Sequence, residues 1–131
     1  MRYSLILVFL LTSSVVFAQD SVKTNCNDVQ SQLALNECSA KDLVESENRL
    51  QDAYDLAIKK LDETNQTEKK DLFLKTQNIW EEYKNVNCDV QAGKQEESGS
   101  IWPYLVNSCN ARMNNDRATE IKTTIYLEPS N

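Results

Sequence analysis

Apolar residues recur at the spacing of α-helices over residues 31–92. No proline or glycine occurs between Ser31 and Gly93, and helix-favouring residues are frequent in this stretch. Residues three and four positions apart share one face of a helix, so each run of such positions predicts an apolar stripe. In the first predicted helix, the stripe consists of Ala40, Leu43, Glu47, Leu50, Tyr54, Ala57 and Leu61. In the second, it consists of Leu72, Thr76, Ile79, Tyr83, Val86 and Val90, widened by Phe73 and Trp80.

A polar break separates these two helices. The segment 62–67 (DETNQT) interrupts the pattern, and Thr67 is a suitable N-cap for the second helix. A short connection between two long helices predicts an antiparallel hairpin, in which residues equidistant from the turn face each other. Glu47, the single acid of the first stripe, then falls opposite Lys84. We expect an ion pair between Glu47 and Lys84, because a partly buried charge needs a partner.

A third helix is expected after a connecting loop. Residues 92–100 (AGKQEESGS) contain both glycines of the chain and predict a flexible loop. Ser100 can cap the helix that follows, and Pro103 is tolerated in its first turn. Residues of this helix then recur every four positions, at Leu105, Cys109, Met113, Arg117 and Ile121. The sequence therefore predicts an all-α domain, formed by an antiparallel helical hairpin plus a third helix.

The first 18 residues have the composition of a secretory signal peptide. Arg2 provides a positive charge, an apolar run follows from Leu5, and the small side chains of Val16 and Ala18 predict cleavage after Ala18. The apolar run is shorter than the roughly 20 residues of a membrane-spanning helix. No cysteine follows the cleavage site to accept a lipid. We expect export of a single soluble domain, residues 19–131, with no membrane insertion after cleavage.

The charge balance narrows the class of partner. The chain has 14 basic and 20 acidic side chains and a net charge of −6 at pH 7. Removal of residues 1–18 takes away Arg2 alone among the charged residues and makes this charge one unit more negative. Such an acidic protein is not expected to bind nucleic acid or anionic membranes. Steering by opposite charge favours a basic protein partner, and the alternative is that the charge serves only solubility.

Four cysteines and no histidine constrain the fold and the chemistry. In a small exported domain, Cys26, Cys38, Cys88 and Cys109 predict two disulfides, for which three pairings are possible. A zinc site is disfavoured because no two cysteines have the short spacing of zinc ligands, and we expect no metal and no other cofactor. Without a histidine base, nucleophilic catalysis is disfavoured, and a pair of carboxylates is the remaining enzymatic alternative. We expect a binding protein and not an enzyme.

Several motifs in a fixed order carry a resemblance to a known family. They are Cys26, Leu-Asn-Glu-Cys at 35–38, Glu47 with Leu50 and Tyr54, Leu-x4-Gln-x2-Trp-x2-Tyr-Lys-x3-Cys over 72–88, and Gly99-Ser100 ahead of Cys109 and Arg117. Together they resemble the LprI-type lysozyme inhibitor family of small exported bacterial proteins, over nearly all of residues 26–121. The chain departs from the family pattern at two places, with Glu47 where Asp is usual and Lys84-Asn85 where Arg-Asp is usual.

The resemblance implies a disulfide pairing and a function. It implies the pairs Cys26–Cys38 and Cys88–Cys109, and the expected fold agrees with the second pair because it places position 88 opposite about position 108. Together with the acidic charge, the resemblance favours the hypothesis of a periplasmic or secreted protein that inhibits a lysozyme-like muramidase, with a basic lysozyme as partner. Inhibition would be by occlusion, with Glu96, Glu97 and neighbouring loop residues approaching the cleft. The alternative is a non-enzymatic interaction protein of the envelope with no muramidase target. The oligomeric state is left open.

Three sets of residues are candidates for binding. Gln77, Trp80 and Tyr83 could form a recognition surface, but such residues more often pack a helix interface. Arg117 could bind a ligand carboxylate, but a structural salt bridge to an acid on the first helix is the more common arrangement. The loop between the second and third helices is the best candidate for partner contact, because binding residues favour loops held on rigid scaffolds; a simple connector is the alternative. The candidate residues of this loop are Lys94, Glu96, Glu97, Ser98, Gly99 and Ser100.

Overall fold

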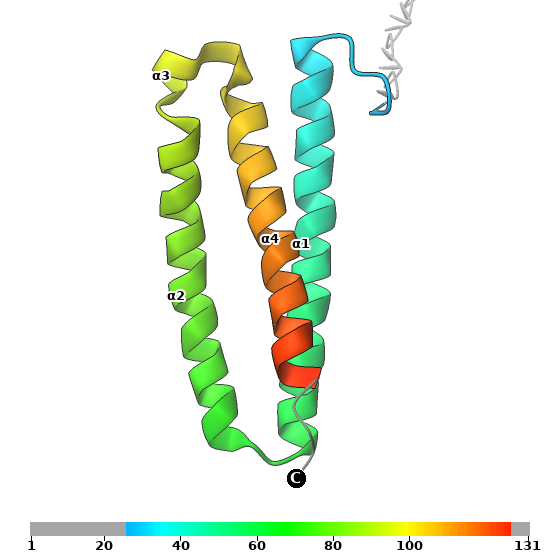
Figure 1. Cartoon of the computed structure of the whole chain (residues 1–131), viewed down its shortest axis with the longest axis vertical. Coiled ribbons are helices and arrows are strands. Elements are labelled where there is room, and N and C mark those ends of the chain that lie inside the picture. Colours follow the sequence, from blue (N-terminus) through cyan, green and yellow to red (C-terminus); the bar gives the residue numbers. More distant parts are fainter. Residues whose placement is uncertain (1–25, 127–131) are drawn as a thin grey trace, which may run out of the picture.

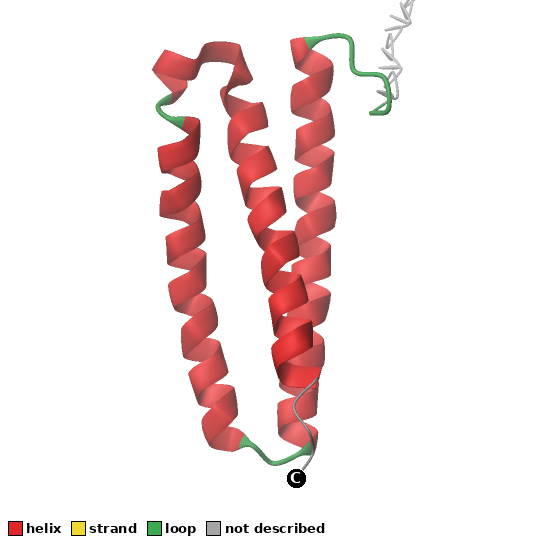
Figure 2. Cartoon of the chain, in the orientation of Figure 1, coloured by secondary structure: helices red, strands yellow, loops and turns green. Residues whose placement is uncertain are grey.

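The computed structural model describes residues 26–126, and these form an all-α fold (Figure 1 and Figure 2). Three long helices run along the molecule: α1 (Gln32–Glu63), α2 (Thr67–Ala92) and α4 (Trp102–Tyr126). A short helix, α3 (Gln95–Ser98), and a 3₁₀ turn, η1 (Gly99–Ile101), connect α2 to α4. The expected signal peptide, residues 1–18, lies outside the described residues. Within residues 26–126, no helix combines the length and the apolar character needed to cross a membrane.

Nearby residues determine where α1 begins and where the chain turns after it. Ser31 is the N-cap, and its hydroxyl accepts a hydrogen bond from the backbone N–H of Ala34, which satisfies one of the free N–H groups of the first turn. Beyond the other end, Asn65 has a left-handed backbone with a φ of 54°, a conformation in which asparagine is enriched. The chain reverses there and α2 begins. The N-cap of α2 is Gln66, so the prediction that Thr67 caps this helix is wrong.

The main packing partner of α1 is α4, and α2 contacts both helices less extensively. Figure 1 shows α4 beside α1 over much of its length, with α2 at the edge of the bundle. The core consists of Leu50, Ala53, Ala57 and Leu61 of α1 and Ala118 and Ile121 of α4, against which Phe73 and Trp80 of α2 pack. Ala53 and Ala57 are fully buried, and such small side chains allow closely spaced helices. The predicted hairpin is therefore right in connectivity, but its two helices are not each other's main partner.

The apolar stripe predicted for α2 faces solvent, which corrects the packing expected from the sequence. Its large members Leu72, Ile79, Tyr83, Val86 and Val90 are each more than half exposed. The buried residues of α2 are Lys84, Cys88 and Ala92, and the half-buried Trp80 lies on the same side. The prediction assumed that α1 would cover the stripe. Because α1 packs mainly on α4, only one face of α2 reaches the interior, and that face is not the most apolar one.

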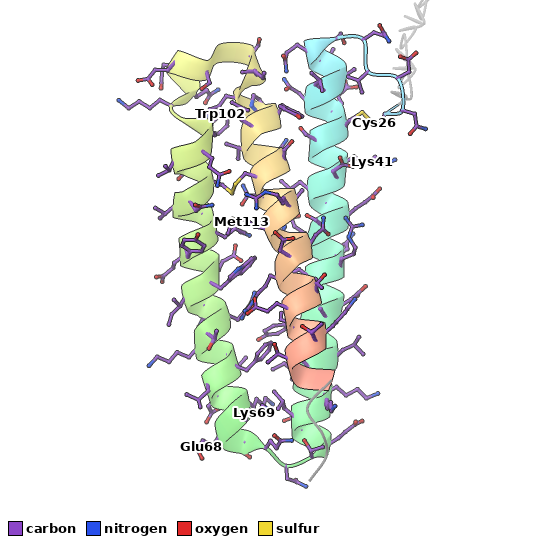
Figure 3. The ribbon with its side chains drawn as sticks, in the orientation of Figure 1. Cys26, Lys41, Glu68, Lys69, Trp102 and Met113 are labelled. Carbon is purple, nitrogen blue, oxygen red and sulfur yellow. A yellow bond between two sulfur atoms is a disulfide. The ribbon has the colours of Figure 1, made fainter. Side chains whose placement is uncertain are left out.

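Both disulfide pairs implied by the family resemblance are confirmed. The Cys26–Cys38 bond attaches the segment before α1 to that helix, with the two Cα atoms 5.6 Å apart. The Cys88–Cys109 bond joins α2 to α4, also with a Cα–Cα distance of 5.6 Å. Met113 packs with the second disulfide in a buried cluster, and Figure 3 shows it beside the sulfur atoms between the two helices. The structure therefore confirms the predicted all-α fold with two disulfides.

Candidate functional site

The connection between α2 and α4 is the candidate for partner contact, and we call residues 93–101 the end turn. It lies at one end of the bundle (Figure 1). A flexible loop is expected here from the sequence, but the structure shows α3 followed by η1. Gly93 and Gly99 flank α3 with φ angles of 69° and 59°, a backbone conformation that glycine adopts without steric cost. The two glycines thus mark the points where the chain changes direction.

Hydrogen bonds fasten the end turn to all three long helices. Ser98 Oγ donates to the carbonyl of Ala92 in α2 at 2.8 Å. The indole N–H of Trp102 in α4 donates to the carbonyl of Gly93 at 2.9 Å. From α1, the amide of Asn36 donates to the carbonyl of Ser100 at 2.9 Å. Trp102 is labelled at this end of the molecule in Figure 3. A segment held in this way has little conformational freedom left to lose on binding, which favours affinity.

The exposed side chains of the end turn carry charges of both signs. Lys94 and Glu97 form an ion pair with a distance of 3.8 Å between Nζ and Oε1, and their side chains are 78% and 70% exposed. Glu96 is exposed as well. Ion pairs this exposed contribute little to folding stability. Lys94 and Glu97 can therefore leave this pair and bind charged groups of a partner with little loss of stability. The end turn is suited to contact with a charged protein surface.

A buried chain of polar groups connects α2, α4 and α1. Lys84 is only 7% exposed; its ammonium lies 2.7 Å from the carboxylate of Glu81 and donates to Asn114 Oδ1 at 3.3 Å. Asn114 Nδ2 donates in turn to Ser46 Oγ at 3.1 Å. Burying a polar group without a hydrogen bond lowers folding stability. In this row of polar groups, each buried member has a hydrogen-bond or ion-pair partner.

The expected ion pair between Glu47 and Lys84 is replaced by the pair between Lys84 and Glu81. Glu47 is exposed, and it lines, together with Lys84, a hollow of about 420 Å³. The register argument treated α1 and α2 as direct neighbours. Asn114 of α4 lies next to Lys84 on the side where α1 was expected. The ion-pair partner of Lys84 is Glu81, on the same helix.

Arg117 is held by side chains of α2 and of its own helix. It is 7% exposed; its Nε donates to Gln77 Oε1 at 3.1 Å, and its Nη1 lies 2.8 Å from Glu120 Oε2. Its guanidinium also lies 5.8 Å from the ring centre of Trp80, within the range of cation–π attraction. The interpretation of Arg117 as structural is supported, but its acid is on α4 and not on the first helix. Tyr83 is 59% exposed, so the expectation that it packs an interface within the chain is wrong.

The described residues offer no site for a metal ion. Among residues 26–126, no group of three or more histidine, cysteine or acidic residues is placed to hold a cation. The buried cations Lys84 and Arg117 both have carboxylate partners. What the arrangement can do is present a fixed, charged surface to another protein.

Comparison with protein families classifies the chain. Residues 24–121 match the model of a family described as Lysozyme inhibitor LprI. The chain belongs to the LprI family. Comparisons with curated proteins and with solved structures gave no match. LprI membership confirms the resemblance that the motifs carry, and it implies a lysozyme-inhibitor function with a lysozyme as the protein partner.

The motif residues of this LprI chain serve mainly to join its helices. Gln77 and Trp80 of α2 contact Arg117 of α4, and the four motif cysteines form the two disulfides. Sequence reasoning missed Ser46 and Asn114, which are both fully buried. A signal for Ser46 exists, because it belongs to a row of small residues at helical spacing along α1, namely Ser39, Ser46, Ala53 and Ala57. For Asn114 the sequence holds no comparable signal.

Proposed function

We propose that this protein is an exported inhibitor of a lysozyme-like muramidase and that it acts by occlusion, with the end turn placed at the mouth of the enzyme's cleft. LprI membership is the observation that carries the proposal. The construction of the end turn supports it, because this segment is exposed, charged and fastened to three helices. The inhibitor binds and excludes the polysaccharide, and neither protein is changed covalently.

Different residues of the end turn take different roles in this proposal. Muramidases cleave their substrate with a pair of carboxylates in the cleft, and the ammonium of Lys94 is complementary to them in charge. Glu96 and Glu97 complement basic residues around the cleft of a basic lysozyme. The net charge of −6 steers the encounter at longer range. Ser98, Gly99 and Ser100 give the turn its shape and anchor it to α1 and α2.

We place the protein in the periplasm or in the secreted fraction of a bacterium. The signal-type pattern of residues 1–18 supports this location. The two disulfides support it as well, because such bonds form and persist in oxidising compartments and are rare in the cytosol. The lysozymes that attack a cell wall act in the same compartments.

Reversing the acidic charges of the end turn is expected to weaken inhibition. We expect Glu96→Lys combined with Glu97→Lys to raise the concentration needed for half-inhibition about tenfold, since each exposed charge pair contributes up to roughly 1 kcal/mol. The measurement is the rate of turbidity loss of a bacterial cell-wall suspension, with purified oxidised inhibitor titrated against several types of lysozyme.

A matched variant controls for net charge. Asp52→Lys combined with Asp55→Lys makes the same charge change at exposed positions of α1, away from the end turn, and should retain inhibition. Equal loss in both double variants would mean that only long-range charge matters. Unchanged lysis by every lysozyme type in the presence of equimolar wild-type protein would disprove the proposed function itself.

A further inference from the structure

The solvent-facing side of α2 carries an apolar stripe with the spacing of a coiled-coil seam. We call Leu72, Thr76, Ile79, Tyr83, Val86 and Val90 the α2 stripe. Successive members lie alternately four and three residues apart, which is the repeat by which two helices pack side by side. The large members are between 58% and 78% exposed. Monomeric soluble proteins rarely expose a contiguous apolar patch larger than a few hundred Å².

The α2 stripe lies on a different side of the helix from the face that holds the bundle together. The interior face of α2 presents Trp80, Lys84 and Cys88, which contact α4. Among the described residues, the large side chains of the stripe are more than half exposed; Leu72 and Thr76 border a hollow that α4 also lines, and α2 forms an edge of the bundle (Figure 1). From Leu72 to Val90 it extends over about 27 Å of helix. This length is enough for a two-stranded interface.

Among residues 26–126, the large side chains of the α2 stripe stay more than half exposed. A second copy of the stripe has the same length and the same apolar repeat, so two copies can form a matched coiled-coil seam.

We propose that the α2 stripes of two copies of this chain pack together as an antiparallel coiled coil. Antiparallel pairing centred near residue 81 places Leu72 opposite Val90 and Ile79 opposite Tyr83 of the second copy. The shorter Thr76 then faces Val86. Each facing pair thus joins one residue of the row 72, 79 and 86 to one residue of the row 76, 83 and 90. Pairing between the two rows is the arrangement of antiparallel coiled coils.

The charges at positions 75 and 89 favour this orientation over a parallel one, and their two contacts outnumber the one like-charge contact that it creates, between Glu82 of the two copies midway along the same flank. Lys75 and Asp89 lie along the same flank of the stripe, two heptads apart, and both are exposed. Neither has an ion-pair partner among the described residues. In the antiparallel pair, Lys75 of each copy meets Asp89 of the other, so the contact forms twice. In a parallel pair these two residues stay about 21 Å apart along the axis and cannot meet.

The test is the oligomeric state of oxidised residues 19–131 without lysozyme. Analytical ultracentrifugation is expected to show a monomer–dimer equilibrium with a dissociation constant on the order of 10 μM, as for a small interface. Ile79→Glu combined with Val86→Glu should give a monomer of unchanged helix content by circular dichroism. Val44→Glu is the matched control, because Val44 is 55% exposed on α1 and its substitution should leave the dimer intact.

Charge exchange tests the orientation. Lys75→Glu and Asp89→Lys should each weaken the dimer severalfold, and the two together should restore it. A protein that stays monomeric up to about 500 μM would overturn the proposal, as would a dimer that persists in the Ile79→Glu/Val86→Glu variant. Failure of the double charge exchange to restore the dimer would overturn the antiparallel arrangement. A wild-type monomer whose inhibition of lysozyme is lost in the Ile79→Glu/Val86→Glu variant would instead assign the stripe to the enzyme.

Discussion

Replacing Cys88 and Cys109 by alanine is expected to lower the free energy of unfolding by about 3 kcal/mol, because the disulfide closes a long loop in the unfolded chain. The two cysteines are 21 residues apart in sequence. They are also buried, at 0% and 6% exposure, so the substitution leaves space beside Met113 as well. The bond joins α2 to α4, and α2 has few other contacts with the rest of the bundle. Urea unfolding followed by circular dichroism measures the loss.

The other disulfide provides the comparison. Cys26 is exposed, and its bond to Cys38 fastens only the segment that precedes α1. We expect alanine at Cys26 and Cys38 to cost less than alanine at Cys88 and Cys109, although the chain-entropy model assigns roughly 3 kcal/mol to a loop of either size. The difference arises because the released segment can detach while the three helices stay packed. Equal losses would show that this segment is part of the cooperative unit.

Ile121→Ala is expected to destabilise the protein by about 3 kcal/mol, whereas Ile79→Ala should change the free energy of unfolding by less than about 0.5 kcal/mol. The two isoleucines form a matched pair, since Ile121 is 2% exposed in the core and Ile79 is 58% exposed on the α2 stripe. Removing buried methylene groups leaves a cavity, whereas removing exposed ones does not.

This comparison should be made by urea unfolding at about 1 μM protein, where self-association contributes little to stability. A larger loss for Ile79→Ala than for Ile121→Ala would mean that the α2 stripe is interior. The hairpin packing expected from the sequence would then be correct, and the packing of α1 on α4 would be wrong.

The helices, the two disulfides and the position of the end turn could be predicted from the sequence. Helix content follows from residue types and from spacing, which are local properties. The cysteine pairing came from family resemblance, because four cysteines alone allow three pairings. The internal structure of the end turn was not predicted. The two glycines indicated flexibility. The hydrogen bonds that hold the turn come from Asn36, which is distant in sequence, and from Trp102, which lies just after the turn in α4.

The packing partners of the helices could not be predicted, for a physical reason visible in α1 and α2. An apolar stripe shows that a face can be buried, but it does not identify the helix that covers it. On α1, the row that includes Ser46, Ala53 and Ala57 is more deeply buried than Tyr54, because small side chains let α4 approach. On α2, the most apolar stripe is the exposed one. The error over Glu47 and Lys84 followed directly, since the predicted register left out α4.

Competition between the inhibitor and a soluble cell-wall oligosaccharide for one muramidase tests the central claim most directly. The measurement is a calorimetric titration of the enzyme with oxidised inhibitor, with and without an oligosaccharide that fills the cleft. If the end turn occludes the cleft, saturating oligosaccharide should abolish detectable binding of the inhibitor, and the Glu96→Lys/Glu97→Lys variant should bind weakly in its absence. Unchanged affinity in the presence of saturating oligosaccharide would contradict inhibition by occlusion.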